Sequence, residues 1–284
     1  MDDVRLGNAA TFERLEHFYD AVPRDVARVE EHGPLVLFVR EGPGWPFYAR
    51  PRLDATAPVS VADVTAVRQR QRQLGQPEAF EWVHERNPDL LAVTRAAGLA
   101  VLEAPLMVLD PAAALAAPAD FTDVPVRLLD PAAPGFAADV AARRAVAAVG
   151  FAVAGTARGE VGPAQRDAAI TELDAASLEE ERSRTADGRR LSVLAETPTE
   201  GALASGMAMP VGDTAEIAGV ATLPSARRRG LAAAVTAALA HALRRAGVDL
   251  IFLSAGSEEI ARVYLRVGFR RLGTACIAEP SALI

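Results

Sequence analysis

The second half of the chain carries a regular pattern of apolar and polar residues. Residues 216–222 (EIAGVAT) read as a strand, and after a proline turn residues 231–246 (LAAAVTAALAHALRRA) follow the period of a helix. Residues 248–255 (VDLIFLSA) form a β-branched, apolar run that is typical of a buried parallel strand. The pattern therefore predicts a strand, a helix and a second strand in succession.

A short amphipathic helix is predicted next, within residues 257–269 (SEEIARVYLRVGF). Ser257 is suited to cap its amino terminus, and acidic residues occupy its first turn. Apolar side chains recur at helical spacing at Ile260, Val263, Tyr264 and Val267. This spacing places Tyr264 on the inward-facing stripe of the helix.

Before residue 216, the pattern predicts one strand, then helical material, then two strands. These elements are expected at 124–129, 133–149, 163–182, 190–196 and 201–210. A segment rich in Pro, Ala and Asp at 110–124 has little periodicity, and we interpret it as the joint between two halves. The length of 284 residues allows two domains, each long enough to bury a core.

The first half repeats the order of elements expected at 231–279. The pattern predicts a helix, a strand, a helix and a strand at 61–74, 79–83, 87–97 and 99–109. Gly98 and Gly268 occupy equivalent places 170 residues apart. The repeat predicts two related halves, 1–118 and 119–284, although two α/β halves can also share such an order by chance.

The turn between the strand at 216–222 and the helix at 231–246 carries the run RRRGLA, residues 227–232. A glycine at the start of a helix lets the backbone approach an anion closely, and the first free N–H groups point at it. The helix dipole adds roughly half a positive charge, which the arginines reinforce. The run therefore predicts a site for a pyrophosphate group, against the alternative of an ordinary turn with solvated arginines.

This segment resembles motif A of the GNAT superfamily of acyl-CoA-dependent N-acyltransferases, which reads Q/R-x-x-G-x-G/A between a strand and a helix. The pattern also occurs at 95–100 and 270–275, but only Gly230 stands between an apolar strand and a long helix. Tyr264 with the Gly-Phe pair at 268–269 is similar to a second pattern of the family. The order of the predicted elements also matches the GNAT fold.

The resemblance implies the fold class α/β (α+β), a mixed twisted sheet flanked by helices, with the GNAT fold in residues 119–284. The layout is similar to that of tandem members of the superfamily, which implies a degenerate GNAT-like domain in residues 1–118. At the offset of 170 residues, Thr94 stands in place of Tyr264, and residues 57–62 (APVSVA) supply neither glycine nor cation. A cradle without them does not hold pyrophosphate. We therefore expect residues 1–118 to be non-catalytic and to have a packing role.

The resemblance names acetyl-CoA as the co-substrate. It implies that the acetyl group passes to a primary amine by direct attack in a ternary complex. In the family, the strand before the cradle pairs its free backbone groups with the pantetheine arm. By position, the implied cofactor-binding residues are Val220, Ala221, Thr222, Arg227, Arg228, Arg229, Gly230, Leu231 and Ala232.

Two residues are catalytic candidates by the same resemblance. Glu216 lies eleven residues before Arg227, where GNAT histone acetyltransferases carry a general-base glutamate. The alternatives for Glu216 are substrate orientation or an exposed place at the start of a strand, with water as the route for the proton. Tyr264 is the candidate for the general acid, against the alternative of an aromatic residue of the core.

Composition narrows the other classes of function. The net charge is −7 and all 30 cationic residues are arginine, which argues against a general nucleic-acid binder. The four histidines are scattered without metal-ligand spacing, so no metal is expected. A catalytically inactive acyl-CoA sensor or scaffold stays open. A nucleotide-binding protein is a weaker alternative, because a chain without lysine has no G-x-x-x-x-G-K-S/T motif.

We expect the chain to be cytoplasmic and to bind no membrane. A single cysteine, Cys276, excludes an intrachain disulfide framework, and no apolar run approaches the roughly 18 residues of a membrane helix. The acidic, polar start MDDVRLGN does not resemble a signal peptide. The expected partner is an amine-bearing acceptor, left open among small amines, aminoglycosides, peptide amino termini and protein lysines. A homodimer is left open as well.

Overall fold

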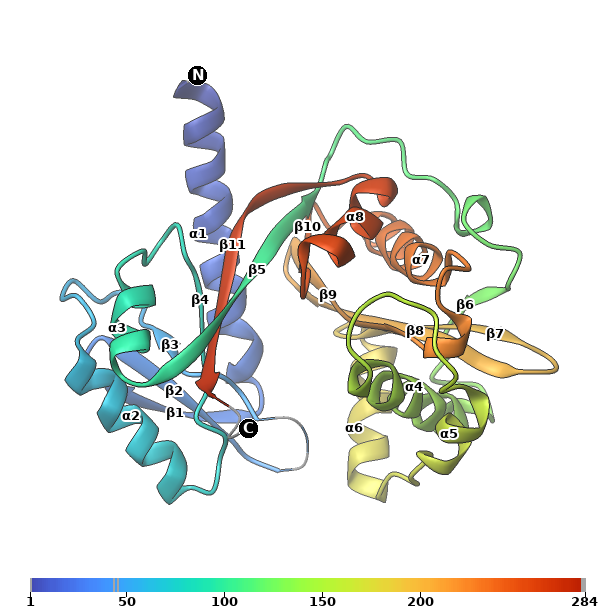
Figure 1. Ribbon diagram of the computed structural model, residues 1–284, viewed down its shortest axis with the longest axis horizontal. Helices are drawn as coiled ribbons and strands as arrows, with labels where there is room; N and C mark the ends of the chain where they lie inside the picture. The colour runs from blue at the N-terminus through green and yellow to red at the C-terminus, as the bar shows by residue number, and fades with distance from the viewer. Residues whose placement is uncertain (1, 43, 45, 282–284) are drawn as a thin grey trace. The chain divides into compact units, whose positions relative to one another are not determined.

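The computed structural model describes residues 2–42, 44 and 46–281, and side chains from residue 8 onward (Figure 1). They form two compact units, Met1–Leu106 with Arg271–Ile284 as unit 1 and Met107–Arg270 as unit 2. These units differ from the predicted domains 1–118 and 119–284 at both ends of unit 2. The physical reason at the second end is strand pairing, because β11 (Phe269–Pro280) hydrogen-bonds antiparallel to β4 (Phe80–Val83).

Unit 2 is built on a mixed sheet. Its strands, in order across the sheet, are β10 (Leu250–Ser254), β9 (Thr214–Thr222), β8 (Gly201–Val211), β7 (Leu191–Thr197) and β6 (Val126–Leu128). Three pairs of neighbours are antiparallel, namely β6 with β7, β7 with β8, and β8 with β9, whereas β9 and β10 are parallel. The end of β5 (Leu99–Leu109), from Met107 on, also belongs to this unit. The predicted α/β class with a mixed sheet is therefore confirmed.

Helices cover both faces of this sheet (Figure 1). α7 (Leu231–Arg245) and α8 (Glu258–Val267) lie on one face, and α4 (Phe136–Ala152), α5 (Pro163–Ala168) and α6 (Ala175–Ala186) lie on the other. α7 buries a stripe of large apolar residues four positions apart, while its alanines allow a close approach to the sheet. Gly206 of β8 makes room for this helix, since a Cβ there would lie 2.7 Å from Cγ1 of Val235.

The helical material expected at 163–182 forms two helices rather than one. α5 ends at Ala168, and α6 starts again at Ala175. Asp174 caps α6 by accepting a hydrogen bond of 2.8 Å from the backbone N–H of Ser177. A capping aspartate inside a helical pattern begins a new helix, and this explains the break.

Unit 1 contains one long helix, a three-stranded sheet and strands of the eight-stranded sheet. It begins with α1 (Asp2–Arg24), followed by the antiparallel strands β1 (Ala27–His32), β2 (Leu35–Arg40) and β3 (Arg50–Pro51). β4, β11 and β5 are neighbours in the second sheet, and α2 (Val61–Gln73) and α3 (Leu90–Ala96) complete the unit. Our sequence interpretation assigned no element before residue 61, whereas the structure has a helix and three strands there.

The core of unit 1 surrounds the strand β4. Phe80 and Trp82 are fully buried, and Cys276 of β11 packs in the same cluster. Burial raises the pKa of the Cys276 thiol to about 12, and the nearby carboxylates of Glu103 and Glu85 act in the same direction. Cys276 is therefore a small buried apolar residue of this core.

Three pairs of elements begin 170 residues apart. α2 and α7, β4 and β10, and β5 and β11 start at residues 61 and 231, 80 and 250, and 99 and 269. The predicted repeat of element order is confirmed, while the assignment of residues 1–118 to a degenerate GNAT-like domain stays a prediction. The last strands are exchanged, because β11 lies beside β4 and β5 lies beside β10. Each half of the sequence thus supplies a strand that pairs with the other half.

Candidate functional site

Strands β9 and β10 separate part of the way along their length. Their parallel pairing joins Thr214–Glu216 to Leu250–Phe252, although β9 continues to Thr222 and β10 to Ser254. A bulge in β9 follows the last pair, at Gly219, where the φ of 62° is a left-handed conformation that glycine adopts without strain. Beyond Glu216 the edge of β9 that faces β10 is therefore open to a ligand.

A cavity of about 640 Å³ lies at this divergence. It is lined by residues within four segments, at 150–156, 220–222, 226–233 and 259–266. All four belong to unit 2. The structure brings together these predicted cofactor-binding residues in its wall: Val220, Ala221, Thr222, Arg227, Arg228, Gly230, Leu231 and Ala232. Arg229 is outside the lining.

The amino terminus of α7 opens into the cavity. Gly230 is the N-cap, no side-chain hydrogen bond caps the helix in its described surroundings, and its first turn has no acidic residue. The first N–H groups of a helix have no partner within the helix, and they carry the positive end of its dipole. Leu231, Ala232 and Ala233 line the cavity at this point. The arrangement can therefore accept an anion.

The equivalent helix of unit 1 begins differently. Ser60 caps α2 by accepting a hydrogen bond of 3.2 Å from the backbone N–H of Asp63, whose carboxylate accepts one of 2.8 Å from the N–H of Ser60. This capping box satisfies N–H groups that α7 leaves open, and it places an acid in the first turn. We predicted that residues 57–62 form no cradle because they lack a glycine and a cation. The capping box is a further physical reason.

Gly230 is required by the protein itself. Its φ is 78°, and a Cβ at this position would overlap the carbonyl group of Phe121, whose carbon atom would be 2.8 Å away. Phe121 follows the short 3₁₀ helix Pro118–Asp120. The sequence argument reserved this space for pyrophosphate. The structure places the Phe121 carbonyl there, and the same turn lines the cavity through Gly230.

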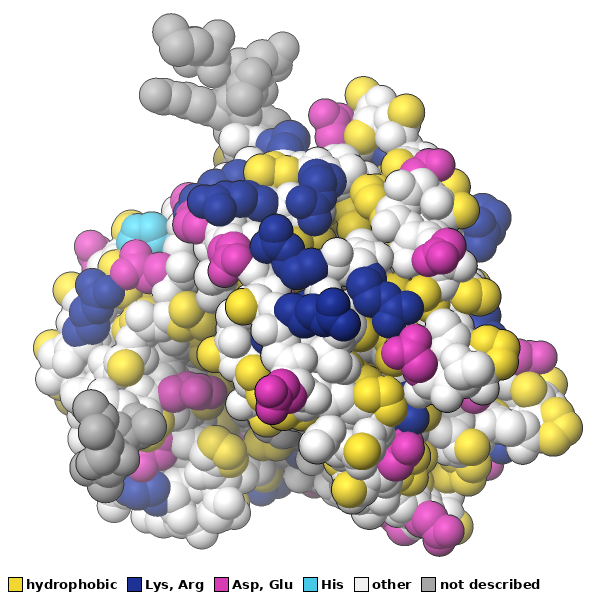
Figure 2. Space-filling view, turned by 45° about the vertical axis from the view of Figure 1, so that its right-hand side comes forward, with side chains coloured by type: hydrophobic (Ala, Val, Ile, Leu, Met, Phe, Trp, Pro, Cys, Tyr) yellow, Lys and Arg dark blue, Asp and Glu magenta, His cyan; other side chains and the backbone are white. Residues whose placement is uncertain are grey.

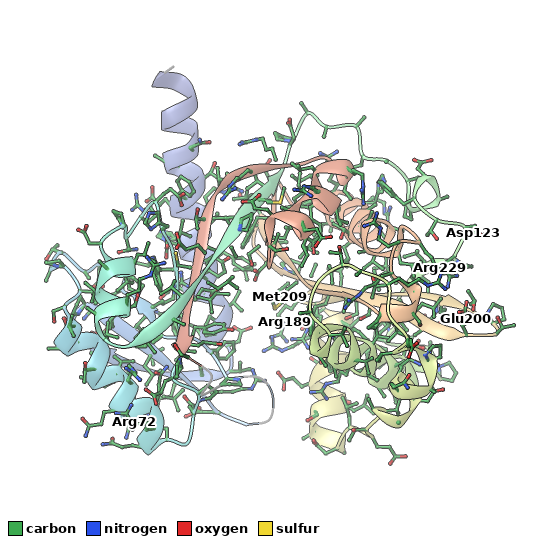
Figure 3. The ribbon with its side chains drawn as sticks, viewed as in Figure 1. Arg72, Asp123, Arg189, Glu200, Met209 and Arg229 are labelled. Atoms are coloured by element: carbon green, nitrogen blue, oxygen red, sulfur yellow. The ribbon has the colours of Figure 1, made fainter. Side chains whose placement is uncertain are left out.

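The three consecutive arginines have three different surroundings. Arg227 donates hydrogen bonds to backbone carbonyl oxygens, and burial lowers its pKa. Arg228 adopts a left-handed φ of 66° and lines the cavity. Arg229 forms an ion pair of 3.3 Å with Glu200 in the turn between β7 and β8, as Figure 3 illustrates. Arg229 thus pairs with a carboxylate outside the cavity lining, and its predicted contact with the anion stays a prediction.

Two further arginines on the cavity wall escaped the sequence interpretation. Arg262 and Arg266 lie one turn apart on α8, and both line the cavity, as Arg228 does. Within the described residues none of these three side chains takes part in an ion pair, whereas Glu259 is the one acidic residue of the lining. Arginine side chains gather on the face shown in Figure 2 although the net charge is −7. The i, i+4 spacing of Arg262 and Arg266 was the signal available in the sequence.

Tyr264 occupies the inner wall of the cavity. Its side chain is 6% exposed and packs edge-on against Phe269, with the ring centres 6.3 Å apart. Burial raises the pKa of the phenol to about 12, so Tyr264 is protonated at neutral pH. The predicted inward stripe of this helix is confirmed, and so is the cap, because Ser257 accepts a hydrogen bond of 3.2 Å from the Ile260 N–H.

Glu216 lies outside the cavity lining, to which Tyr264 belongs. It pairs with Phe252 in the section where β9 and β10 are still joined, and Met209 of β8 lies on its other side (Figure 3). Its side chain is half-buried. The reason is its place in the strand, since the cavity begins only after the two strands have separated.

Two features of the cavity wall suit the binding of a ligand. The hydroxyl oxygen of Thr222 is buried with no hydrogen-bond partner among the described residues, although buried hydroxyl groups ordinarily have one. Phe151, at the end of α4, is 63% exposed beside the cavity.

Among the described residues, no three His, Cys, Asp or Glu side chains lie close enough together to hold a metal ion. Within the residues that the structure describes, no helix is long and apolar enough to cross a bilayer.

Comparison with known proteins relates this site to one fold. Residues 195–277, which include β8 to α8, match the family model described as "FR47-like protein". No match was found among curated proteins. The solved structure of a GCN5-related N-acetyltransferase from Kribbella flavida superposes with a TM-score of 0.63 at 22% identity, over 96% of each chain.

Two other solved structures resemble the chain over most of its length. A putative GNAT-family acetyltransferase from Novosphingobium aromaticivorans has a TM-score of 0.53 at 17% identity, over 91% of this chain and 93% of its own. A GCN5-related N-acetyltransferase-like protein from Streptococcus suis has a TM-score of 0.52 at 13% identity, over 95% and 98%. At these identities the likeness shows the fold alone. The predicted GNAT fold is thus confirmed, and that fold suggests acyltransferase activity.

Proposed function

We propose that this protein is an N-acetyltransferase that transfers the acetyl group of acetyl-CoA to a primary amine by direct attack in a ternary complex. The observation that carries the proposal is the uncapped start of α7, which opens into a cavity at the point where β9 and β10 separate. A helix start of this kind binds phosphate groups, and a free strand edge binds an extended amide-bearing chain. Acetyl-CoA contains both groups in one molecule.

The residues of the cavity fit this co-substrate. The N–H groups at Gly230, Leu231 and Ala232 would hold the pyrophosphate, with Arg228 beside them. The backbone of residues 220–222 would pair with the amides of the pantetheine arm, and the Thr222 hydroxyl would gain its missing partner. The volume of about 640 Å³ is within the usual range for a pocket that binds a small molecule.

Tyr264 supplies the acid of the proposed reaction. The amine nitrogen attacks the thioester carbon, the new C–N bond forms, and the C–S bond breaks. Tyr264 enters the reaction protonated, because burial raises its pKa to about 12; it gives this proton to the departing thiolate and regains one from water. The amine loses its own proton to water, and Glu216 receives it only through water because this carboxylate is outside the cavity lining.

The test is ligand binding followed by turnover. Calorimetry with acetyl-CoA, CoA and ATP should find one site per chain for acetyl-CoA and CoA and none for ATP. Release of thiol from acetyl-CoA should then depend on both the protein and one member of an amine panel. Binding of ATP without acetyl-CoA would overturn the proposal. Binding of acetyl-CoA with no thiol release on any amine would favour the sensor or scaffold alternative.

A further inference from the structure

The loop after α4 forms one wall of the cavity and is bonded to the turn that precedes α7. We name residues 153–162 the wall loop. The backbone N–H of Gly159 donates to the Pro224 carbonyl at 3.0 Å, and the N–H of Ser225 donates to the Val161 carbonyl at 2.9 Å. Arg158 adds a hydrogen bond of 3.0 Å to the Ser225 carbonyl. The wall loop and the turn at 224–226 therefore hold each other in place.

Arg227 is the side chain at the centre of this contact. Its guanidinium donates to four carbonyl oxygens, of Gly150 at 2.9 Å, Val153 at 2.6 Å, Ala154 at 3.4 Å and Ala157 at 3.3 Å. These carbonyls belong to the last turn of α4 and to the wall loop, where a helix leaves its final acceptors without partners. A cation at this end of a helix is also favoured by the dipole.

We propose that Arg227 is a positioning residue for the wall of the cavity and makes no phosphate contact. Each of its two terminal nitrogens donates hydrogen bonds to two carbonyl oxygens, so the guanidinium group faces the end of α4 and the wall loop. Arg227 and Gly230 belong to one short turn, and the wall loop is thereby fixed to the start of α7. A hydrogen bond from Thr156 to Glu259 ties the same loop to α8, which also lines the cavity. The proposal rests on the proposed function only for the identity of the ligand.

Substitution by lysine separates the two roles. Lysine keeps the positive charge, but its single ammonium nitrogen cannot reach two pairs of carbonyl oxygens as the planar guanidinium does. A residue that acts by its charge on a phosphate should be largely rescued by lysine. A residue that acts through the several hydrogen bonds of its guanidinium group to the wall loop should not be rescued by lysine.

The experiment compares amide hydrogen exchange of the free wild-type protein with that of Arg227→Lys and Arg227→Ala. We expect exchange of peptides within 150–162 to rise roughly tenfold or more in both variants, because several charge-assisted hydrogen bonds are lost. Arg244→Lys is the matched control. Arg244 also donates to backbone carbonyls, of Asp110 at 2.9 Å and Ala113 at 3.0 Å, but these are distant in sequence from the wall loop. Its variant should change exchange near residues 110–116 and leave 150–162 unchanged.

Calorimetry with acetyl-CoA completes the test. Arg227→Lys should lose as much affinity as Arg227→Ala, because either variant must first order the wall loop. Wild-type exchange at 150–162 in Arg227→Lys, or full affinity in Arg227→Lys with a loss in Arg227→Ala, would overturn the positioning role. Should Arg227→Ala not fold, Arg227→Lys and Arg227→Gln decide the outcome. If the wild-type protein binds no acetyl-CoA, the proposed function fails, while the exchange of the free protein still decides the role of Arg227.

Discussion

Tyr264 provides the most direct test of the proposed chemistry at the scale of single residues. Tyr264→Phe keeps the packing against Phe269 and removes only the hydroxyl. We expect turnover to fall by about 10²-fold while the affinity for acetyl-CoA stays unchanged, since the acid acts only when the thiolate leaves. Steady-state kinetics with an accepted amine, together with calorimetry, measure the two quantities. Full turnover in the variant would make Tyr264 a residue of the core alone.

The same substitution tests the burial of the phenol. The folded protein holds the Tyr264 proton up to about pH 12, whereas an ordinary phenol loses it near pH 10. The resulting stabilisation is complete below pH 10 and is lost as the pH rises toward 12. We therefore expect the free energy of unfolding in urea to fall more steeply above pH 10 in the wild-type protein than in Tyr264→Phe. Parallel curves for the two proteins would contradict the deep burial of this group.

Gly230 and Gly247 form a matched pair for backbone strain and collision. Both have left-handed φ values, of 78° and 81°, but a Cβ at Gly247 has no neighbour within 4 Å among the described atoms, whereas one at Gly230 meets the Phe121 carbonyl. Gly247→Ala should cost about 1 kcal/mol through backbone strain alone. Gly230→Ala should cost more, by on the order of 1–3 kcal/mol, because Phe121 must move. Urea denaturation measures both, and equal costs would show that the Phe121 segment yields freely.

At the scale of elements, the capped start of α2 and the uncapped start of α7 explain why the proposed anion site belongs to α7 alone. α8 contributes charge to the same cavity through Arg262 and Arg266. The double variant Arg262→Gln and Arg266→Gln should weaken acetyl-CoA binding and reduce the dependence of affinity on salt, because fewer cations face the phosphates. Arg245→Gln, in the last turn of α7 and outside the cavity lining, is the control. Titrations at low and high salt measure the effect, and an unchanged salt dependence in the double variant would remove α8 from the phosphate site.

Elements with strong local signals were predicted closely. α7, β10 and α8 lie within two residues of their expected bounds, because their apolar periods and caps are local in sequence. The break between α5 and α6 was missed, because the apolar pattern continues across it and only the capping residue Asp174 marks the start of a new helix. The carbonyl partners of Arg227 and the approach of Phe121 to Gly230 join segments distant in sequence. No periodicity of one segment reports such contacts, so these parts of the site required the structure.

At the scale of the whole molecule, the repeat was readable from the sequence but the exchange of its last strands was not. β11 pairs with β4, residue Ala275 lying opposite Val83, with all of unit 2 between them along the chain. We expect the separate fragments 1–118 and 119–284 to be unstable, since each lacks a strand of its sheet. Mixing them should restore structure, seen by circular dichroism and by a cooperative melting transition. A cooperative transition in fragment 119–284 alone would contradict this expectation.

The exchanged strand β11 also sets the order in which the protein can mature on the ribosome. β4 emerges early during synthesis, but the strand that completes its sheet is made only after α7, β10 and α8. The edge of β4 at Phe80 and Trp82 therefore has no partner strand while unit 2 is translated. We therefore expect the nascent chain to be prone to aggregation through this edge until β11 has left the exit tunnel.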